Sequence, residues 1–205
     1  MICDALVVVD MQNDFVHGGS LPVKGGLSII PAINALMRKF ETVVFTADWH
    51  PIGHMSFASS HFGKSPYEKI DTPYGRQMLW PDHCVAGTYG AQFVSGLHIE
   101  KATAIIHKGM RRKVDSYSGF MEGDGSTFTG LAGYLRERGI RRVFVCGLAT
   151  DFCVSYTAED AQRAGFDTFV VTDASAAIDT NGSLAMAKER WKRADVVEIS
   201  SEEVV

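Results

Sequence analysis

The chain has 205 residues, of which 46% are hydrophobic, so it can bury the core of an α/β domain, and we expect residues 1–205 to form a single domain. Acidic residues number 24 and basic residues 20, and the net charge of −4 offers no electrostatic attraction for nucleic acid or an anionic membrane. No run of about 18 apolar residues occurs, and the N-terminal apolar run ends at Asp10. We therefore expect neither a membrane span nor a signal peptide, and a cytoplasmic location.

Short runs rich in β-branched residues alternate with amphipathic patterns along the chain. The runs have no period-two alternation, which is typical of strands buried on both faces, and they lie at residues 5–10, 42–48, 103–108, 142–147, 168–173 and 196–199. The patterns between them predict helices at residues 27–40, 129–138, 151–164 and 181–193. This alternation predicts an α/β three-layer sandwich, with a central parallel sheet of about six strands and helices on both faces.

One stretch, residues 49–101, interrupts this alternation. It is rich in Gly, Pro, His and aromatic residues and has no strong helical or strand period, so a short helix or hairpin within it has no predicted position. Loops of that length in a compact domain usually serve a function, which makes this segment a candidate part of a site.

The polar residues at the strand ends predict where the site lies. In open parallel sheets, ligands bind beyond the carboxyl ends of the strands. The predicted strands end in Asp10, Asp48, Lys108 and Asp173, and the strand at 142–147 leads into the segment before Cys153. We expect these groups to converge on one edge of the sheet.

The four cysteines are too sparse for a disulfide scaffold, and in a reduced compartment they would be free thiols. Cys146 lies within a buried run and is interpreted as a core residue. Cys3 and Cys84 have no expected role. Cys153 is therefore the candidate for chemistry.

Cys153 should lie in the first turn of the helix after the fourth predicted strand, with Thr150 or Asp151 near the N-cap. The N–H groups and positive partial charge of a helix N-terminus lower a thiol pKa and can bind an oxyanion. Asp10 could take the thiol proton, and Lys108 could hold both groups in their ionised forms. The alternatives are a small buried hydrophobic residue at Cys153 and a structural ion pair between Asp10 and Lys108.

Asp48, His50 and His83 form a candidate metal site. Asp48 and His50 alternate at a strand end and can point the same way, and His83 can come from the long loop. A carboxylate and two imidazoles suit one divalent ion, with Zn²⁺ expected first and Mn²⁺ or Fe²⁺ as alternatives. His54 stays open as a further ligand.

Three aromatic residues lie near these motifs in the sequence: Phe15, Trp80 and Tyr117. They can be core residues, or they can line a flat apolar slot for an aromatic ring.

In this order, the motifs resemble those of the nicotinamidase/pyrazinamidase family within the isochorismatase-like cysteine hydrolases. The resemblance runs from about residue 5 to about residue 180. The motifs are VDMQNDF at 9–15, DWHPIGHMSF at 48–57, WPDHC at 80–84, KG at 108–109, DSYSGF at 115–120 and GLATDFCV at 147–154.

The resemblance implies a catalytic triad of Asp10, Lys108 and Cys153. It also implies a cis peptide between Leu148 and Ala149, with an oxyanion hole formed by the N–H groups of Ala149 and Cys153. It further implies one divalent metal ion on Asp48, His50 and His83, and a ring pocket lined by Phe15, Trp80 and Tyr117. In some family members a histidine in the place of His54 also binds metal, but the spacing from His50 is shorter here.

The activity implied by the resemblance is hydrolysis of nicotinamide to nicotinate and ammonia through a cysteine thioester, in NAD salvage. The metal would anchor the pyridine nitrogen, and pyrazinamide is a second expected substrate. Two alternatives stay open: a related amidohydrolase acting on another small amide or ureido substrate, and a non-hydrolytic metal or thiol module. Small α/β enzymes often form symmetric assemblies, so a homo-oligomer is also considered, with no predicted interface.

Overall fold

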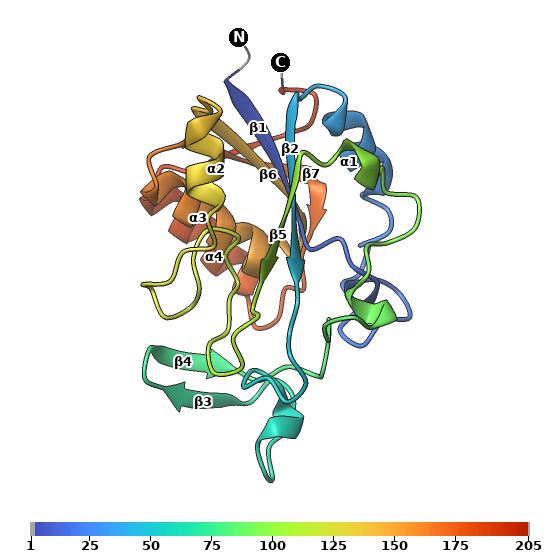
Figure 1. The fold of residues 1–205 in the computed structure, drawn as a ribbon, viewed down its shortest axis with the longest axis vertical. Helices are drawn as coiled ribbons and strands as arrows, with labels where there is room; N and C mark the ends of the chain where they lie inside the picture. Colours follow the sequence, from blue (N-terminus) through green and yellow to red (C-terminus); the bar gives the residue numbers. More distant parts are fainter. Residues whose placement is uncertain (1–2, 205) are drawn as a thin grey trace.

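The structure is a computed structural model that describes residues 3–204 (Figure 1). Six strands form one sheet in the order β5-β2-β1-β6-β7-β8, and every neighbouring pair in it is parallel. Their bounds are β1 Asp4–Val9, β2 Thr42–Asp48, β5 Ala104–Lys108, β6 Arg142–Leu148, β7 Asp167–Ala176 and β8 Val197–Ile199. All six predicted strands are present, with ends shifted by a few residues at most.

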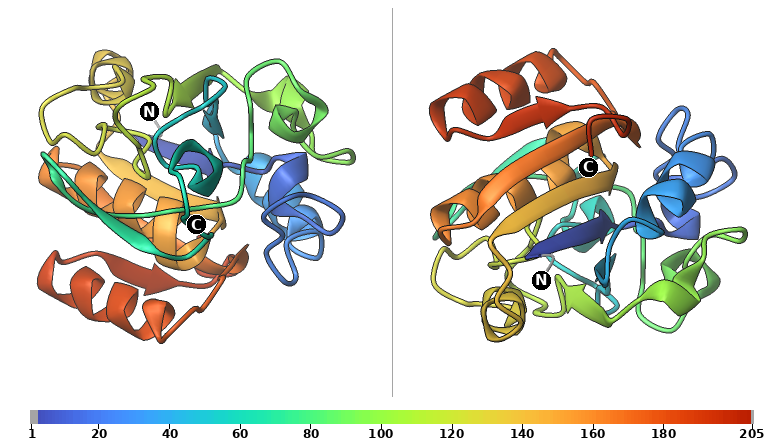
Figure 2. Two further views of the ribbon diagram at one scale, coloured as in Figure 1. Left: turned by 90° about the horizontal axis from the view of Figure 1, so that it is seen from below. Right: turned by 90° about the horizontal axis from the view of Figure 1, so that it is seen from above.

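Helices cover both faces of this sheet, as Figures 1 and 2 show. Alternate residues of each strand point to opposite faces, so Leu6 and Val8 pack in the core beneath α1, whereas Val7 and Val9 pack in the core on the other face. The helices are α1 Ile30–Met37 on the first face, and α2 Leu131–Glu137, α3 Ser155–Arg163 and α4 Ser183–Arg193 on the second. The predicted three-layer sandwich is confirmed.

The helices begin later than the hydrophobic patterns predict. α1 begins at Ile30 with Pro31 in its first turn, where the fixed φ of proline suits a helix start. α2 and α4 each follow a glycine in the left-handed region, Gly130 and Gly182, which a continuous right-handed helix cannot contain.

The long segment after β2 forms a hairpin and several single turns. β3 (Lys69–Thr72) and β4 (Gly75–Met78) pair antiparallel, and the hairpin lies beyond the carboxyl ends of the sheet strands (Figure 1). Of the hairpin strand residues, Gln77 is the buried one. The hairpin strands are short and mostly exposed, which explains why the sequence shows no strand period there.

The prediction that Asp173 joins the other strand ends is wrong. β7 continues through Ala176, so Asp173 lies inside the strand, and its exposed side chain accepts hydrogen bonds from the N and Oγ of Ser201 at 2.7 and 2.5 Å. Asp173 therefore anchors the C-terminal segment and is not part of a site.

The longest described helix, α4, has 11 residues, and within residues 3–204 no helix combines the length and the apolar character needed to cross a membrane.

Gly147 provides a test of how closely β6 and β1 approach. It pairs with Val9 at a φ of +113°, and a Cβ added there would overlap the Val9 carbonyl oxygen and lie 2.8 Å from the Val9 nitrogen. Because neither backbone can move away within the sheet, we expect Gly147→Ala to lower the free energy of unfolding by about 3 kcal/mol. Urea unfolding followed by circular dichroism measures this loss.

Gly133 is the matched control. It lies within α2, and a Cβ added there meets no atom within 4 Å. Gly133→Ala should therefore stabilise the protein by about 0.5–1 kcal/mol through helix propensity. Equal unfolding free energies for the two variants would contradict the close approach at Gly147.

Candidate active site

A buried lysine lies at the centre of the site. Strand register pairs Asp48 at the end of β2 with Lys108 at the end of β5, and Asp10 follows the last residue of β1. Lys108 Nζ lies 2.8 Å from Asp10 Oδ2 and 2.5 Å from Asp48 Oδ1, and it donates to the Ser116 carbonyl at 3.1 Å. The Lys108 side chain is fully buried, so its charge is stabilised by these oxygens and not by water.

Cys153 joins this cluster from the turn after β6. Its Sγ lies 3.4 Å from Lys108 Nζ, and Sγ, an Asp10 oxygen and an Asp48 oxygen lie within 4.8 Å of one another. The structure thus brings together Asp10, Lys108 and Cys153, the three residues that the sequence proposed as a triad. Their convergence also agrees with the prediction that the polar strand ends meet at one edge.

The turn that carries Cys153 differs from the predicted first turn of an α-helix. Residues Thr150–Val154 form a π-helical turn before α3, and no side chain caps it. Asp151 instead accepts hydrogen bonds from the backbone nitrogens of Ile178 and Asp179, at 3.0 and 2.8 Å. The expectation that Thr150 or Asp151 caps this turn is therefore wrong, because Asp151 holds the loop after β7.

The peptide between Leu148 and Ala149 is cis, as the family resemblance implies. The Ala149 carbonyl accepts hydrogen bonds from the nitrogens of Phe152 and Val154, both at 3.1 Å, and neither bond uses the N–H of Cys153. Ala149 and Cys153 both line the same cavity. N–H groups on such a turn are suitable donors for an oxyanion.

The two carboxylates beside Lys108 have opposite pKa shifts. Burial raises the pKa of Asp10, so this group can hold a proton more readily than an exposed aspartate. Burial also favours the protonated form of Asp48, but the charges of Lys108 and His50 outweigh it and hold the Asp48 pKa well below its usual value. Burial raises the pKa of the Cys153 thiol despite the nearby Lys108. Asp10 is therefore suited to exchange a proton with the thiol, while Asp48 stays ionised.

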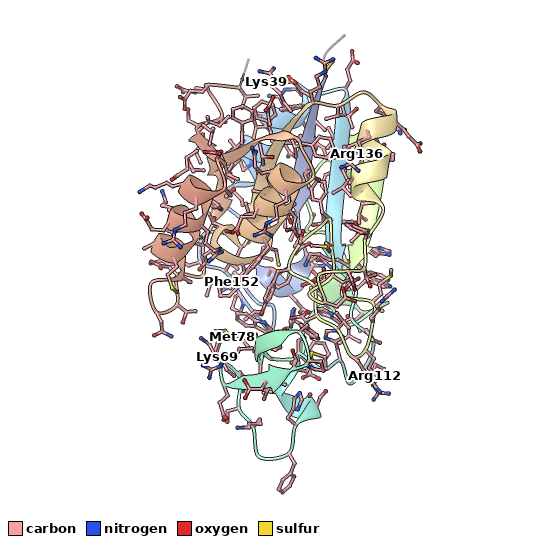
Figure 3. The ribbon with its side chains drawn as sticks, turned by 90° about the vertical axis from the view of Figure 1, so that its left-hand side faces the viewer. Lys39, Lys69, Met78, Arg112, Arg136 and Phe152 are labelled. Atoms are coloured by element: carbon pink, nitrogen blue, oxygen red, sulfur yellow. The ribbon has the colours of Figure 1, made fainter. Side chains whose placement is uncertain are left out.

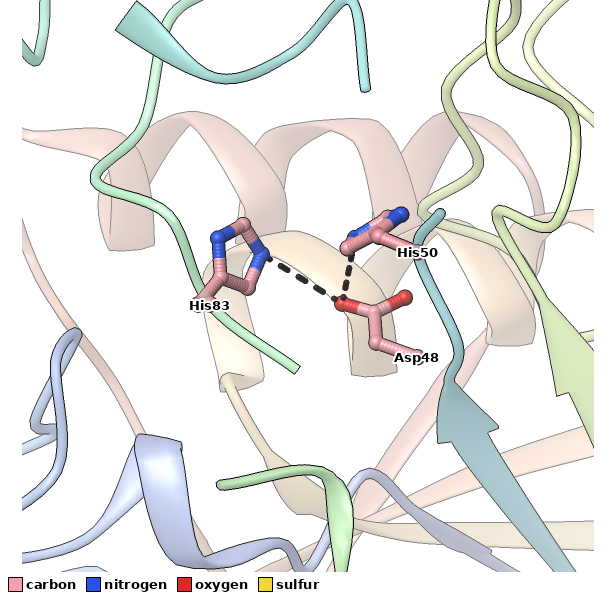
Figure 4. Close-up of side chains that lie close together, drawn as sticks. All are labelled: Asp48, His50 and His83. Atoms are coloured by element: carbon pink, nitrogen blue, oxygen red, sulfur yellow. Dashed lines mark ion pairs between the residues drawn. The ribbon is translucent and has the colours of Figure 1, made fainter. Parts of the chain in front are cut away.

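Asp48, His50 and His83 form a compact ligand group (Figure 4). Asp48 Oδ2 lies 3.5 Å from His50 Nε2 and 3.7 Å from His83 Nε2, and the three ligand atoms lie within 4.8 Å of one another. The His50 Nδ1 lies 2.9 Å from the Gly109 carbonyl and the His83 Nδ1 lies 2.7 Å from the Pro81 carbonyl. A carbonyl only accepts, so each Nδ1 carries a proton, and each Nε2, the nitrogen left to bind a metal, faces Asp48. The donor set and its orientation fit a divalent metal.

His54 lies beside this group but points elsewhere. Its ring stacks on His50 with 4.2 Å between centroids, its Nε2 lies 3.1 Å from the Val114 carbonyl, and its Nδ1 lies 2.7 Å from Ser56 Oγ. Both nitrogens thus have protein partners. His54 therefore packs against the His50 ring and lies outside the group that His50 forms with Asp48 and His83.

An aromatic cavity adjoins both clusters. Trp80 Nε1 donates to Tyr117 Oη at 3.0 Å, and the ring of Phe152 lies nearly perpendicular to Trp80 at 5.0 Å. Figure 3 shows Phe152 close to the hairpin that carries Met78. The lining residues are Phe15, Leu21, Asp48, Trp80, His83, Asp115, Tyr117, Ala149, Phe152, Cys153 and Ile178. Such a slot accommodates a small flat ring beside a thiol.

Sequence reasoning missed several residues of this site. Phe152 had an available signal, because it directly precedes Cys153. Gln77 had none: it lies on the exposed hairpin, yet its side-chain nitrogen donates to Asp115 Oδ2 at 2.7 Å and to Tyr117 Oη at 3.2 Å. Thr46 was not singled out either, although its hydroxyl contacts Asp10.

Comparison with known proteins gives consistent results. The family model described as the isochorismatase domain matches residues 4–202. The nicotinamidase of Acinetobacter baylyi is 53% identical over 201 residues, which cover 98% of this chain and 94% of that protein. The solved structure of a nicotinamidase/pyrazinamidase of Acinetobacter baumanii has a TM-score of 0.98 at 52% identity, covering 100% of this chain and 99% of that one.

Two further solved structures contain bound groups. A protein of L. infantum in complex with nicotinate has a TM-score of 0.85 at 42% identity, covering 97% of this chain and 93% of that one. A pyrazinamidase of Pyrococcus horikoshii in complex with zinc has a TM-score of 0.78 at 39% identity, covering 96% of this chain and 98% of that one. From the family match over nearly its whole length and these close relatives, the chain belongs to the isochorismatase domain family, within the group that includes nicotinamidases and pyrazinamidases.

Proposed function

We propose that this protein hydrolyses nicotinamide to nicotinate and ammonia, as a cysteine-dependent amidohydrolase of NAD salvage. The observation that carries the proposal is the buried cluster of Asp10, Lys108 and Cys153, which meets an aromatic cavity beside Asp48 and two histidines. Relatives named as nicotinamidases, and one solved with nicotinate, support this substrate. Pyrazinamide has a similar flat ring and the same carboxamide, so we propose it as a second substrate.

Acylation begins with proton transfer from Cys153 Sγ to Asp10. The thiolate attacks the carboxamide carbon, and the N–H groups of Ala149 and Cys153 stabilise the oxyanion. Asp10 then gives its proton to the leaving nitrogen, the C–N bond breaks, and ammonia departs from a thioester on Cys153. Lys108 stays protonated throughout, because the Asp10 and Asp48 carboxylates raise its pKa well above the ordinary value although burial would lower it.

Deacylation repeats the same proton movements with water. Asp10 takes one proton from the water as the oxygen attacks the thioester carbon, and the C–S bond breaks to release nicotinic acid, which loses its remaining proton to solvent and becomes nicotinate. The proton on Asp10 returns to Cys153 Sγ, which restores the starting state. Proximity of the three groups within the buried cluster makes each transfer short.

Asp48, His50 and His83 would hold one divalent metal ion, for which zinc is our first choice and manganese or iron the alternatives. When bound, the ion supplies a Lewis acid that anchors a ring nitrogen of the substrate. The zinc complex of the Pyrococcus horikoshii relative supports a metal here. Trp80 and Tyr117 would then orient the ring within the cavity.

Another amide or ureido substrate within the same superfamily is the second candidate, and the aromatic cavity argues against it.

The positions of Cys146 and Cys153 argue against a thiol redox module. Cys146 packs in the core beneath α1 and Cys153 packs in the core on the opposite face of the sheet, so the two cannot form a disulfide without moving the sheet.

The decisive assay is ammonia release from nicotinamide by metal-loaded protein, with and without a chelator. We expect release that the chelator abolishes and that added Zn²⁺ or Mn²⁺ restores. Absence of ammonia from metal-loaded protein would refute nicotinamidase activity, and release from a ureido compound alone would favour the second candidate.

Replacement of the nucleophile tests the thioester. We expect Cys153→Ala to lower kcat by at least about 10⁴-fold, because no other group can attack, while nicotinamide still binds. Stopped-assay kinetics and calorimetric binding measure the two effects. Cys146→Ala, which removes a buried core thiol, is the control and should keep its kcat; comparable losses in both variants would argue against a special role for Cys153.

Metal content tests the ligand group independently of activity. We expect His83→Ala to lose the metal, measured by mass spectrometry of the purified protein, because it removes one of three ligands. His54→Ala should retain the metal, with affinity lowered by no more than about 100-fold, since His54 only supports His50. A metal-free His54→Ala protein would instead make His54 a ligand.

The single-domain organisation, the cytoplasmic location and a homo-oligomer stay predictions.

A further inference from the structure

Thr46 makes hydrogen bonds to Asp10 through both its backbone and its side chain. It lies on β2, beside the end of β1, and is fully buried. Its Oγ1 donates to Asp10 Oδ1 at 2.6 Å, and its carbonyl accepts from the Asp10 nitrogen at 3.2 Å. Among residues 3–204, Thr46 Oγ1 is the side-chain donor that hydrogen-bonds Oδ1.

The two oxygens of Asp10 consequently have different environments. Oδ1 accepts from Thr46, whereas Oδ2 faces Lys108 Nζ at 2.8 Å. A carboxylate oxygen has two lone pairs, so Oδ2 can accept a proton on one while the other faces the ammonium. The proton would come from Cys153 Sγ, which lies within 4.8 Å of an Asp10 oxygen in the same cluster.

The backbone of Asp10 makes these tethers necessary. Its φ is +48°, a left-handed conformation that a non-glycine residue keeps only when its surroundings hold it. Besides the bonds with Thr46, the backbone N–H of Gln12 donates a hydrogen bond to the Asp10 carbonyl at 2.8 Å. These backbone bonds fix the position of Asp10, whereas Thr46 Oγ1 and Lys108 Nζ act on the orientation of its carboxylate, one at each oxygen.

Thr46 is itself held in one orientation. A Cβ added to Gly119 would lie 2.7 Å from the Thr46 methyl carbon, so the methyl branch lies close against the Gly119 backbone. The hydroxyl branch points to Asp10. A β-branched side chain with both branches in contact has one accessible χ1 rotamer, which makes the hydroxyl a rigid donor.

We propose that Thr46 is a positioning residue whose hydroxyl holds Asp10 Oδ1, so that Oδ2 is the oxygen that exchanges the proton with Cys153. This role rests on the proposed cysteine hydrolase mechanism. No bond to Thr46 forms or breaks in the reaction: the proton moves from Sγ to Oδ2 and then to the leaving nitrogen. Without the hydroxyl, Oδ1 would be buried with no donor, and the carboxylate could rotate or take a proton on the wrong oxygen.

Two matched pairs of variants separate the hydroxyl from packing. Thr46→Val keeps both branches and removes the hydroxyl, whereas Thr46→Ser keeps the hydroxyl and removes the methyl. Thr46→Ala and Thr46→Ser differ by the hydroxyl alone, and this second pair decides the question if the valine variant does not fold. For each protein we would measure Tm, kcat and KM for nicotinamide, and the rate at which iodoacetamide alkylates Cys153, located by peptide mass spectrometry.

We expect Thr46→Val and Thr46→Ala to lower kcat by about 100-fold, with KM for nicotinamide within about threefold of the unmodified protein. Alkylation of Cys153 should slow by about tenfold in both, because the thiol loses its positioned base. Thr46→Ser should keep kcat within about threefold even where its Tm falls through the lost methyl contact.

Equal kcat values in Thr46→Ser and Thr46→Ala would overturn the proposal, as would a folded Thr46→Val protein with unchanged kcat. A loss confined to KM would overturn it too, since the ring pocket and not Asp10 would then be affected. If the unmodified protein released no ammonia from nicotinamide, the proposed substrate would be wrong. The alkylation rates would still decide whether the Thr46 hydroxyl acts on Asp10 and Cys153.

Discussion

The burial of the Lys108 charge is the constraint on which the rest of the site depends. A fully buried ammonium costs several kcal/mol in lost hydration unless anionic oxygens surround it closely, and Asp10, Asp48 and the Ser116 carbonyl provide these contacts. The ends of β1, β2 and β5 must therefore stay in register. Cys153 approaches the same ammonium from the turn after β6, so four separate segments meet at one nitrogen.

This arrangement links the proposed nucleophile to the proposed metal group through Asp48. One oxygen of Asp48 faces Lys108, and the other faces the Nε2 atoms of His50 and His83. Whether the shared proton lies on Cys153 or on Asp10, two negative groups face a single ammonium, which leaves an excess of one negative charge. A divalent cation beside Asp48 would offset that excess. The metal group and the thiol cluster are thus electrostatically complementary, which gives a physical reason for their adjacency.

Much of this could be predicted from residues alone. Buried β-branched runs mark the strands because a sheet covered on both faces excludes polar side chains, and Asp10, Asp48 and Lys108 at their ends mark the edge where a ligand would bind. The same reasoning failed at Asp173, which looked like a strand end. β7 is longer than its apolar run, and its exposed face accepts a charged residue that bonds Ser201. A strand end read from polarity alone is unreliable where one strand face meets solvent.

The sequence by itself determined the fold class, the order of the six sheet strands and the four α-helices along the chain, and, apart from the error at Asp173, the residues that meet at the sheet edge. These follow from hydrophobic periodicity and from ordered local motifs. Only the tertiary structure decided which oxygen of Asp10 bonds Thr46 and that the Nε2 atoms of His50 and His83 face Asp48 whereas both His54 nitrogens bond elsewhere. It also decided that Gln77, on an exposed hairpin, bonds two residues of the cavity lining, Asp115 and Tyr117. Those features depend on side-chain rotation and on contacts between segments far apart in the chain, and neither leaves a periodic or local signal in the sequence.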